Sequence, residues 1–176
     1  MGGKTAARGR RLMLYFAYGS NMHGAVMRRH APGAEPIGVA RLADYRFVIT
    51  ADGYASVAPA PADVVYGLLW RLTPQDRATL DAWENVAGGL YGAETLPVRI
   101  QMPLGSQEGS EDSGEDRHAL VYIACRQVPG QPRPGYMEVL IEAAQELELP
   151  PDYIAVLASW LQGPVDEALP RFGDFR

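Results

Sequence analysis

The chain contains 176 residues, of which 47% are hydrophobic, and this suffices for the core of a single domain without disulfide or metal cross-links. Its net charge of −5 argues against nucleic-acid binding, because a protein that neutralises phosphates needs a basic surface. The one cysteine, Cys125, cannot form an internal disulfide, and no apolar run reaches the roughly 18 residues of a membrane helix. We therefore expect a cytoplasmic protein that binds neither nucleic acid nor membrane.

The chain is predicted to form one domain with a short segment on either side. Residues 1–11 are basic and lack an apolar run, so we expect a disordered tail rather than a signal peptide. The domain should cover residues 12–163, and residues 164–176 should form a C-terminal extension. Its first elements are a strand over residues 12–18, apolar enough to be buried on both faces, and a short helix over residues 22–29.

Stretches rich in β-branched and aromatic residues predict further strands after this helix. They cover residues 37–42, 45–50, 54–58 and 64–72. The link at Ala43-Asp44 is short, and Asp52-Gly53 is typical of a turn. These connections are too short for crossover helices, so neighbouring strands should be antiparallel.

A helix is predicted to begin after Thr73, because threonine is a good N-cap and the proline that follows it suits the first helical position. We expect the helix to end at Gly88-Gly89, since glycine is favoured just past helix ends. Glu84 would then lie near its C-terminal end, next to Trp83.

Two more strands and two helices complete the predicted domain. The strands cover residues 94–102 and 119–125, and the helices cover residues 136–148 and 151–161. Residues 105–117 are polar, acidic and rich in Gly and Ser, which predicts a mobile loop between the strands. The consistent fold is α+β, a small mixed and mostly antiparallel β-barrel with flanking helices.

The segment Tyr18-Gly19-Ser20-Asn21 is the first candidate site. An apolar strand stops there and a helical segment follows, so the backbone N–H groups of the loop should point beyond the strand end. Gly19 permits close approach of a ligand because it has no Cβ atom. Ser20 and Asn21 can cap the following helix, which would leave its first N–H groups free for an anion. A capped helix without any ligand is the alternative interpretation.

The order of several motifs resembles the gamma-glutamylcyclotransferase superfamily, including its AIG2-like branch. The motifs are Tyr18-Gly19-Ser20-Asn21, Leu80-Asp81-Ala82-Trp83-Glu84, Gly89-Leu90-Tyr91 and Pro134-Gly135-Tyr136. The similarity runs from about residue 14 to residue 160. The family fold, a small mixed barrel with flanking helices, agrees with the fold predicted above.

The resemblance implies an intramolecular aminolysis, in which the α-amine of a γ-glutamyl compound attacks its own side-chain amide. The products are 5-oxoproline and a free amino acid or amine. The resemblance assigns the acid/base role to Glu84 and substrate binding to the loop residues Tyr18, Gly19, Ser20 and Asn21. Tyr91 and Tyr136 match positions that line the family's substrate cavity.

This chemistry needs no metal and no organic cofactor, because the substrate supplies the nucleophile. One carboxylate can take a proton from the attacking ammonium and return it to the leaving amine. Partial burial of Glu84 would raise its pKa toward neutrality and suit it to both steps. A solvated Glu84 is the ordinary alternative, and Tyr91 and Tyr136 could equally be core residues.

Some features do not decide between functions. Asn85 follows the candidate acid where many members of the family have glycine, which could alter the local backbone. His23, His30 and His118 lack metal-ligand spacing, so each should be a surface or loop residue. Three functions stay open: cyclisation of a small γ-glutamyl substrate, cyclisation of a γ-glutamyl group on a larger carrier, and non-catalytic binding of an amino-acid-like ligand. The oligomeric state is not predicted.

Overall fold

The computed structural model describes residues 13–103, 114 and 116–162. The expected tail (1–11), C-terminal extension (164–176) and most of the acidic loop (105–117) lie outside these residues. Three residues of that loop are described, Gly114, Asp116 and Arg117. The last two correct its end, because they belong to the last strand and pair with Arg99 and Val98 of the preceding strand. Backbone pairing across the barrel thus extends the strand beyond its apolar part.

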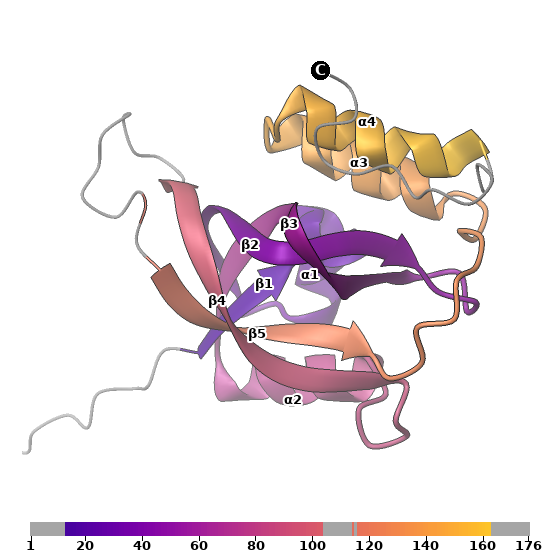
Figure 1. Ribbon diagram of the computed structural model, residues 1–176. Coiled ribbons are helices and arrows are strands. Elements are labelled where there is room, and N and C mark those ends of the chain that lie inside the picture. The colour runs from indigo at the N-terminus through magenta and orange to yellow at the C-terminus, as the bar shows by residue number, and fades with distance from the viewer. Residues whose placement is uncertain (1–12, 104–113, 115, 163–176) are drawn as a thin grey trace, which may run out of the picture.

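Five strands form a closed barrel in the order β1-β3-β2-β4-β5, which confirms the predicted fold class (Figure 1). The barrel closes through a parallel contact between β1 and β5, at Tyr15 and Leu120, while the other pairings are antiparallel. The strands are β1 (Met13–Ala17), β2 (Glu35–Ile49), β3 (Ala55–Leu72), β4 (Tyr91–Pro103) and β5 (Asp116–Ala124). Closure pairs the edge strands with each other and leaves few unpaired backbone groups.

Two pairs of predicted strands are single long strands in the structure. Residues 37–42 and 45–50 merge into β2, and residues 54–58 and 64–72 merge into β3. The break that we expected at Ala43-Asp44 is a bulge in which Asp44 has φ 61°. Ala62, on the facing strand, has φ 69° and donates its N–H to the Asp44 carboxylate at 3.0 Å. These matched irregularities bend the hairpin without ending either strand.

The helices cover two sides of the barrel (Figure 1). They are η1 (Ser20–Met22), α1 (Gly24–His30), α2 (Pro74–Trp83), α3 (Tyr136–Glu146), α4 (Pro151–Ser159) and η2 (Trp160–Gln162). The helices α3 and α4 pack against each other, and α3 contacts η1 at the end of β1. The helix α2 lies on the opposite side of the barrel from the α3–α4 pair. None of the described helices is long and apolar enough to cross a bilayer.

Two features of the sequence explain where these helices form. Thr73 and Asp76 make the capping box of α2: the Asp76 N–H donates to the Thr73 hydroxyl at 3.1 Å, and the Thr73 N–H donates to the Asp76 carboxylate at 3.0 Å. The buried face of α3 carries Met137 and Leu140 at helical spacing. The start of α2 is therefore fixed locally, while α3 is fixed by packing on the barrel.

Candidate active site

A cavity of about 280 Å³ opens beside the end of β1. Its lining includes every residue that the sequence predicted for substrate binding or catalysis: Tyr18, Gly19, Ser20, Asn21, Glu84, Tyr91 and Tyr136. It also includes six residues that the sequence analysis did not select: Tyr15, Tyr54, Ala55, Trp83, Leu90 and Tyr122. The cavity thus brings together segments from both halves of the domain, and tyrosines form much of its wall.

The turn after β1 approaches the rest of the cavity closely at Gly19. The backbone of this residue is in an ordinary region, with φ −108°. A Cβ atom there would lie 3.1 Å from the Tyr136 hydroxyl and 3.5 Å from the Ala55 Cβ atom. Space at this position is therefore tight, and a side chain there would require the Tyr136 hydroxyl to move by a few tenths of an ångström.

Capping of the helix after the loop differs from the prediction. The turn η1 comes first, and α1 is capped by His23, whose Nδ1 accepts from the Ala25 N–H at 3.2 Å. Ser20 lies in η1 itself, and Asn21 is turned inward and is only 4% exposed. Its side chain is therefore unable to cap α1 and instead belongs to the cavity.

Asn21 joins the turn to the candidate acid. Its Nδ2 donates to the Tyr15 hydroxyl at 3.0 Å and makes a longer contact of 3.4 Å with Glu84 Oε1. Its Oδ1 is buried and has no hydrogen-bond partner within the described part of the chain. A buried acceptor without a partner is costly.

The helix that carries Glu84 ends earlier than predicted. It stops at Trp83, five residues before Gly88, and Glu84 is the C-cap. Asn85 has φ 50°, and the Val86 N–H donates to the Asp81 carbonyl at 3.0 Å, which is the bonding pattern of a Schellman motif. Asparagine tolerates this left-handed conformation, so the replacement of glycine preserves the helix end. The turn directs the Glu84 side chain into the cavity.

Burial raises the pKa of Glu84 to about 7. Among the described residues that line the cavity, Glu84 is the one charged side chain. The tyrosines there stay neutral near pH 7, because burial raises the pKa of Tyr15, Tyr18 and Tyr91 well above its usual range. A carboxyl group that titrates near neutrality can both accept and return a proton.

The predicted tyrosines Tyr91 and Tyr136 line the cavity and also bind the same residue of β3. The Tyr91 hydroxyl donates to the Ala55 carbonyl at 2.7 Å, and the Ala55 N–H donates to the Tyr136 hydroxyl at 3.2 Å. The Tyr18 hydroxyl donates to the Tyr122 carbonyl on β5. These bonds hold the aromatic wall in place without using Glu84.

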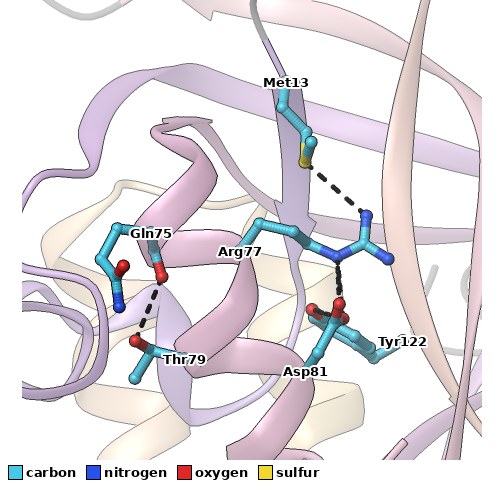
Figure 2. Close-up of polar contacts among 6 residues, drawn as sticks. All are labelled: Met13, Gln75, Arg77, Thr79, Asp81 and Tyr122. Atoms are coloured by element: carbon cyan, nitrogen blue, oxygen red, sulfur yellow. Dashed lines mark hydrogen bonds and ion pairs between the residues drawn. The ribbon is translucent and has the colours of Figure 1, made fainter.

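A side-chain network attaches α2 to the barrel next to the cavity (Figure 2). The Tyr122 hydroxyl donates to Asp81 Oδ1 at 2.6 Å, and Arg77 Nε lies 2.8 Å from the same oxygen. Arg77 also extends toward the Met13 sulfur, at 3.6 Å. Because Asp81 lies one helical turn before Glu84, this network sets the orientation of the helix end that carries the acid.

Neither Tyr15 nor Tyr122 could be selected from spacing, because both lie within strands that look like core. The available signal was the phenolic hydroxyl, which needs a partner when it is buried. A different signal, the position in the sequence, was available for three other lining residues. Each directly precedes an inner residue of the cavity: Tyr54 precedes Ala55, Trp83 precedes Glu84 and Leu90 precedes Tyr91.

One group of possible metal ligands lies outside the cavity. His23, Glu142 and Glu146 bring one ligand atom each to within 4.8 Å of one another, a proximity that their positions in the sequence did not indicate. The Ala25 N–H donates to His23 Nδ1, which places the proton of the neutral ring on Nε2. Since Nε2 faces Glu142 at 3.9 Å, the arrangement suits a polar contact better than a metal ligand.

Comparison with known proteins agrees with the motifs. Residues 64–157 match the AIG2-like family model, and a gamma-glutamylcyclotransferase of Bos taurus is 31% identical over 150 residues, which cover 80% of this chain and 74% of the relative. The chain belongs to the AIG2-like family. The matched region of the family model contains Glu84, Tyr91 and Tyr136, whereas the Tyr18–Asn21 turn lies before it.

Further relatives support the same assignment. A gamma-glutamylcyclotransferase of Homo sapiens is 29% identical over 150 residues, with the same shares of 80% of this chain and 74% of the relative. A solved structure of a gamma-glutamyl cyclotransferase superimposes with a TM-score of 0.74 at 24% identity, and the match covers 93% of this chain and 95% of that one. The solved structure shows a shared fold, and the sequence relatives support a cyclotransferase role.

Proposed function

We propose that this AIG2-like protein converts a small γ-glutamyl amino acid, peptide or amine to 5-oxoproline and the free amino acid or amine. The observation that carries the proposal is the contact of 3.4 Å between Asn21 and Glu84 inside one cavity. Because of this contact, the candidate acid/base and the candidate binding turn face the same cavity. The named activity of the sequence relatives points to the same reaction.

The reaction forms one bond and breaks one. The α-amino nitrogen of the substrate attacks its own γ-carbonyl carbon, and the bond from that carbon to the leaving nitrogen then breaks. Glu84 takes a proton from the α-ammonium group and delivers it to the leaving nitrogen; the second proton, which the α-nitrogen loses as the lactam N–H forms, goes to the released amine, so water is not consumed. The raised pKa of Glu84 suits both transfers, because neither protonation state is strongly favoured near pH 7.

The turn η1 would bind the amino-acid end of the substrate. Its first N–H groups have no acceptor within the turn and suit the α-carboxylate. The α-ammonium group would then lie beside Glu84, which takes its proton. Holding the amino-acid end on this turn, with the γ-carbonyl group in the same cavity, orients the chain for ring closure, and such orientation corresponds to effective molarities of roughly 10⁵–10⁸ M.

The test is a panel of γ-glutamyl donors assayed for 5-oxoproline with the wild-type protein and Glu84→Gln. The panel includes γ-glutamyl amino acids, γ-glutamyl amines, glutathione and a γ-glutamyl group on a carrier protein. We expect turnover of at least one small donor, and a decrease of about 10²–10⁴-fold in kcat for Glu84→Gln. The variant should still bind that donor in calorimetry.

Glu94→Gln is the matched control, because Glu94 is exposed on β4 and does not line this cavity. It should keep wild-type activity. Normal turnover by Glu84→Gln would remove this residue from the mechanism. Binding of a γ-glutamyl compound without any release of 5-oxoproline would instead favour a non-catalytic binding protein.

A further inference from the structure

The mouth of the cavity has an apolar collar, formed by Tyr54, Trp83 and Leu90. Their side chains are 37%, 59% and 36% exposed, and they account for three of the five exposed large hydrophobic residues in the described chain. Apolar residues exposed together at the edge of a cavity are typical of a binding site. Each collar residue directly precedes a residue of the inner wall in the sequence, so the collar adjoins the glutamyl pocket.

The aromatic members of the collar are held in position. The Trp83 ring stacks on His30, with centroids 3.9 Å apart and planes at 27°. The Tyr54 ring meets Tyr136 edge to face at 5.4 Å, and the Arg133 guanidinium lies 4.8 Å from its centroid. These contacts reduce the entropy that the rings would lose on binding a ligand, so the collar is preorganised.

The charge of the cavity also favours an apolar side chain on the ligand. Glu84 is the one charged side chain among the described lining residues, and it is already desolvated. An acidic side chain on the leaving group would approach this carboxylate, and the basic group beside the collar, Arg133, lies outside the described lining and already stacks on Tyr54. Apolar contact with the collar is therefore the favourable interaction left for the leaving group.

We infer that Trp83, Leu90 and Tyr54 form the leaving-group subsite and select γ-glutamyl donors whose leaving amine carries an aromatic or large aliphatic side chain. The inference rests on the function proposed above. In the bound substrate the glutamyl group lies on η1 and the scissile amide lies beside Glu84. The side chain of the leaving amine then packs between the rings of Trp83 and Tyr54.

The test compares γ-glutamylphenylalanine, γ-glutamylglycine and γ-glutamylglutamate as donors, with 5-oxoproline as the readout. We expect kcat/KM for the phenylalanine donor to exceed that for the glycine donor by about 10-fold or more, because hydrophobic groups in such pockets contribute factors of roughly 10–200. The glutamate donor should be the poorest of the three. Trp83→Ala and Leu90→Ala should each lower kcat/KM for the phenylalanine donor more than kcat/KM for the glycine donor, and so remove most of the preference for phenylalanine.

Leu161→Ala is the matched control for Leu90→Ala, because Leu161 is 50% exposed and lies outside the cavity lining. It should leave the preference unchanged, and Trp83→Phe should restore part of what Trp83→Ala loses. Equal kcat/KM for the phenylalanine and glycine donors in the wild-type protein would contradict the role of the collar as the leaving-group subsite, while the proposed cyclotransferase function would stand. An equal loss on both donors in the two alanine variants would contradict that role in the same way. Absence of 5-oxoproline from every donor would overturn the proposed function as well.

Discussion

The two walls of the cavity are fixed by different kinds of interaction. The wall at the end of β1 follows from backbone pairing, because Met13–Ala17 pairs residue by residue with Leu68–Leu72 of β3. The wall at the end of α2 depends on side chains, chiefly Asp81 and its contacts with Arg77 and Tyr122 (Figure 2). The candidate binding turn is therefore positioned by the barrel itself, whereas the position of the candidate acid depends on a few bonds that single substitutions can remove.

The binding wall should be the more sensitive to added bulk. Gly19→Val would place new atoms against the Tyr136 hydroxyl, which lies 3.1 Å from the position of a Cβ atom. We expect kcat/KM to fall by about 100-fold, since a displacement of about 1 Å is enough for such an effect. Steady-state kinetics and calorimetry with a γ-glutamyl donor would measure it.

Tyr136→Phe provides the internal check, because it removes the hydroxyl that valine or alanine would meet. Combined with the milder Gly19→Ala, it should recover part of the lost binding. If Gly19→Val binds the γ-glutamyl donor with wild-type affinity, the glutamyl pocket lies elsewhere. The turn after β1 would then not be the binding wall.

The acid wall should determine the pH dependence. Glu84 must be ionised to accept a proton from the substrate, and burial raises its pKa to about 7. We therefore expect kcat/KM to fall about 10-fold for each pH unit below 7, and to level off above it until the substrate amine titrates. A pH–rate profile would show this limb, which should be absent from the residual activity of Glu84→Gln. An acidic limb near pH 4.5 would mean that the carboxylate is solvated in the working enzyme.

The network that orients α2 should have a smaller effect, mainly on kcat. Asp81→Asn weakens the contacts with Arg77 and Tyr122 but leaves every residue of the cavity wall in place. We expect kcat to fall by about 10-fold with little change in KM, because the acid is displaced while the binding turn is not. Tyr122→Phe should act in the same way, and the double variant should be little worse than either single one.

Asp116→Asn is a matched control for this network. It breaks another Arg–Asp pair, that with Arg99 at 2.8 Å, which is exposed and lies outside the cavity lining. Exposed pairs contribute little, so its kinetics should be those of the wild type. Additive losses in Asp81→Asn and Tyr122→Phe would show that the two residues do not act as one unit.

The sequence predicted the local parts of this arrangement better than the long-range ones. The N-cap at Thr73 and the strand before Gly19 depend on neighbouring residues, and both were placed correctly within a residue or two. The end of α2 was misplaced because Gly88-Gly89 is a strong stop signal, whereas the left-handed residue is Asn85. Closure of β5 onto β1 joins residues about one hundred positions apart, which no local pattern can indicate.

The same reason limited the prediction of the cavity. Glu84 and the turn were proposed together only because the order of the motifs resembled a family. Their contact through Asn21 depends on the tertiary fold. The collar residues were missed because helical spacing alone cannot distinguish an exposed Trp83 at the end of a helix from a buried one.

The smallest predicted effect concerns stability and separates function from folding in the acid wall. A carboxyl group whose pKa is higher in the folded than in the unfolded protein stabilises the fold only when protonated, so this stability is lost as the pH rises from about 4.5 to about 7. The difference corresponds to at most about 3 kcal/mol above pH 7, and the partial exposure of Glu84 reduces it. Glu84→Gln resembles the protonated form, so the variant should unfold about 3–8 °C higher than the wild type at pH 8.

Thermal unfolding at pH 4 and pH 8 would test this prediction. The difference between the wild type and Glu84→Gln should nearly vanish at pH 4, and Glu94→Gln should show no difference from the wild type at either pH. A variant that loses activity and also becomes less stable at pH 8 would show that Glu84 holds the helix end in place, and the contrast between a rigid binding wall and an adjustable acid wall would fail.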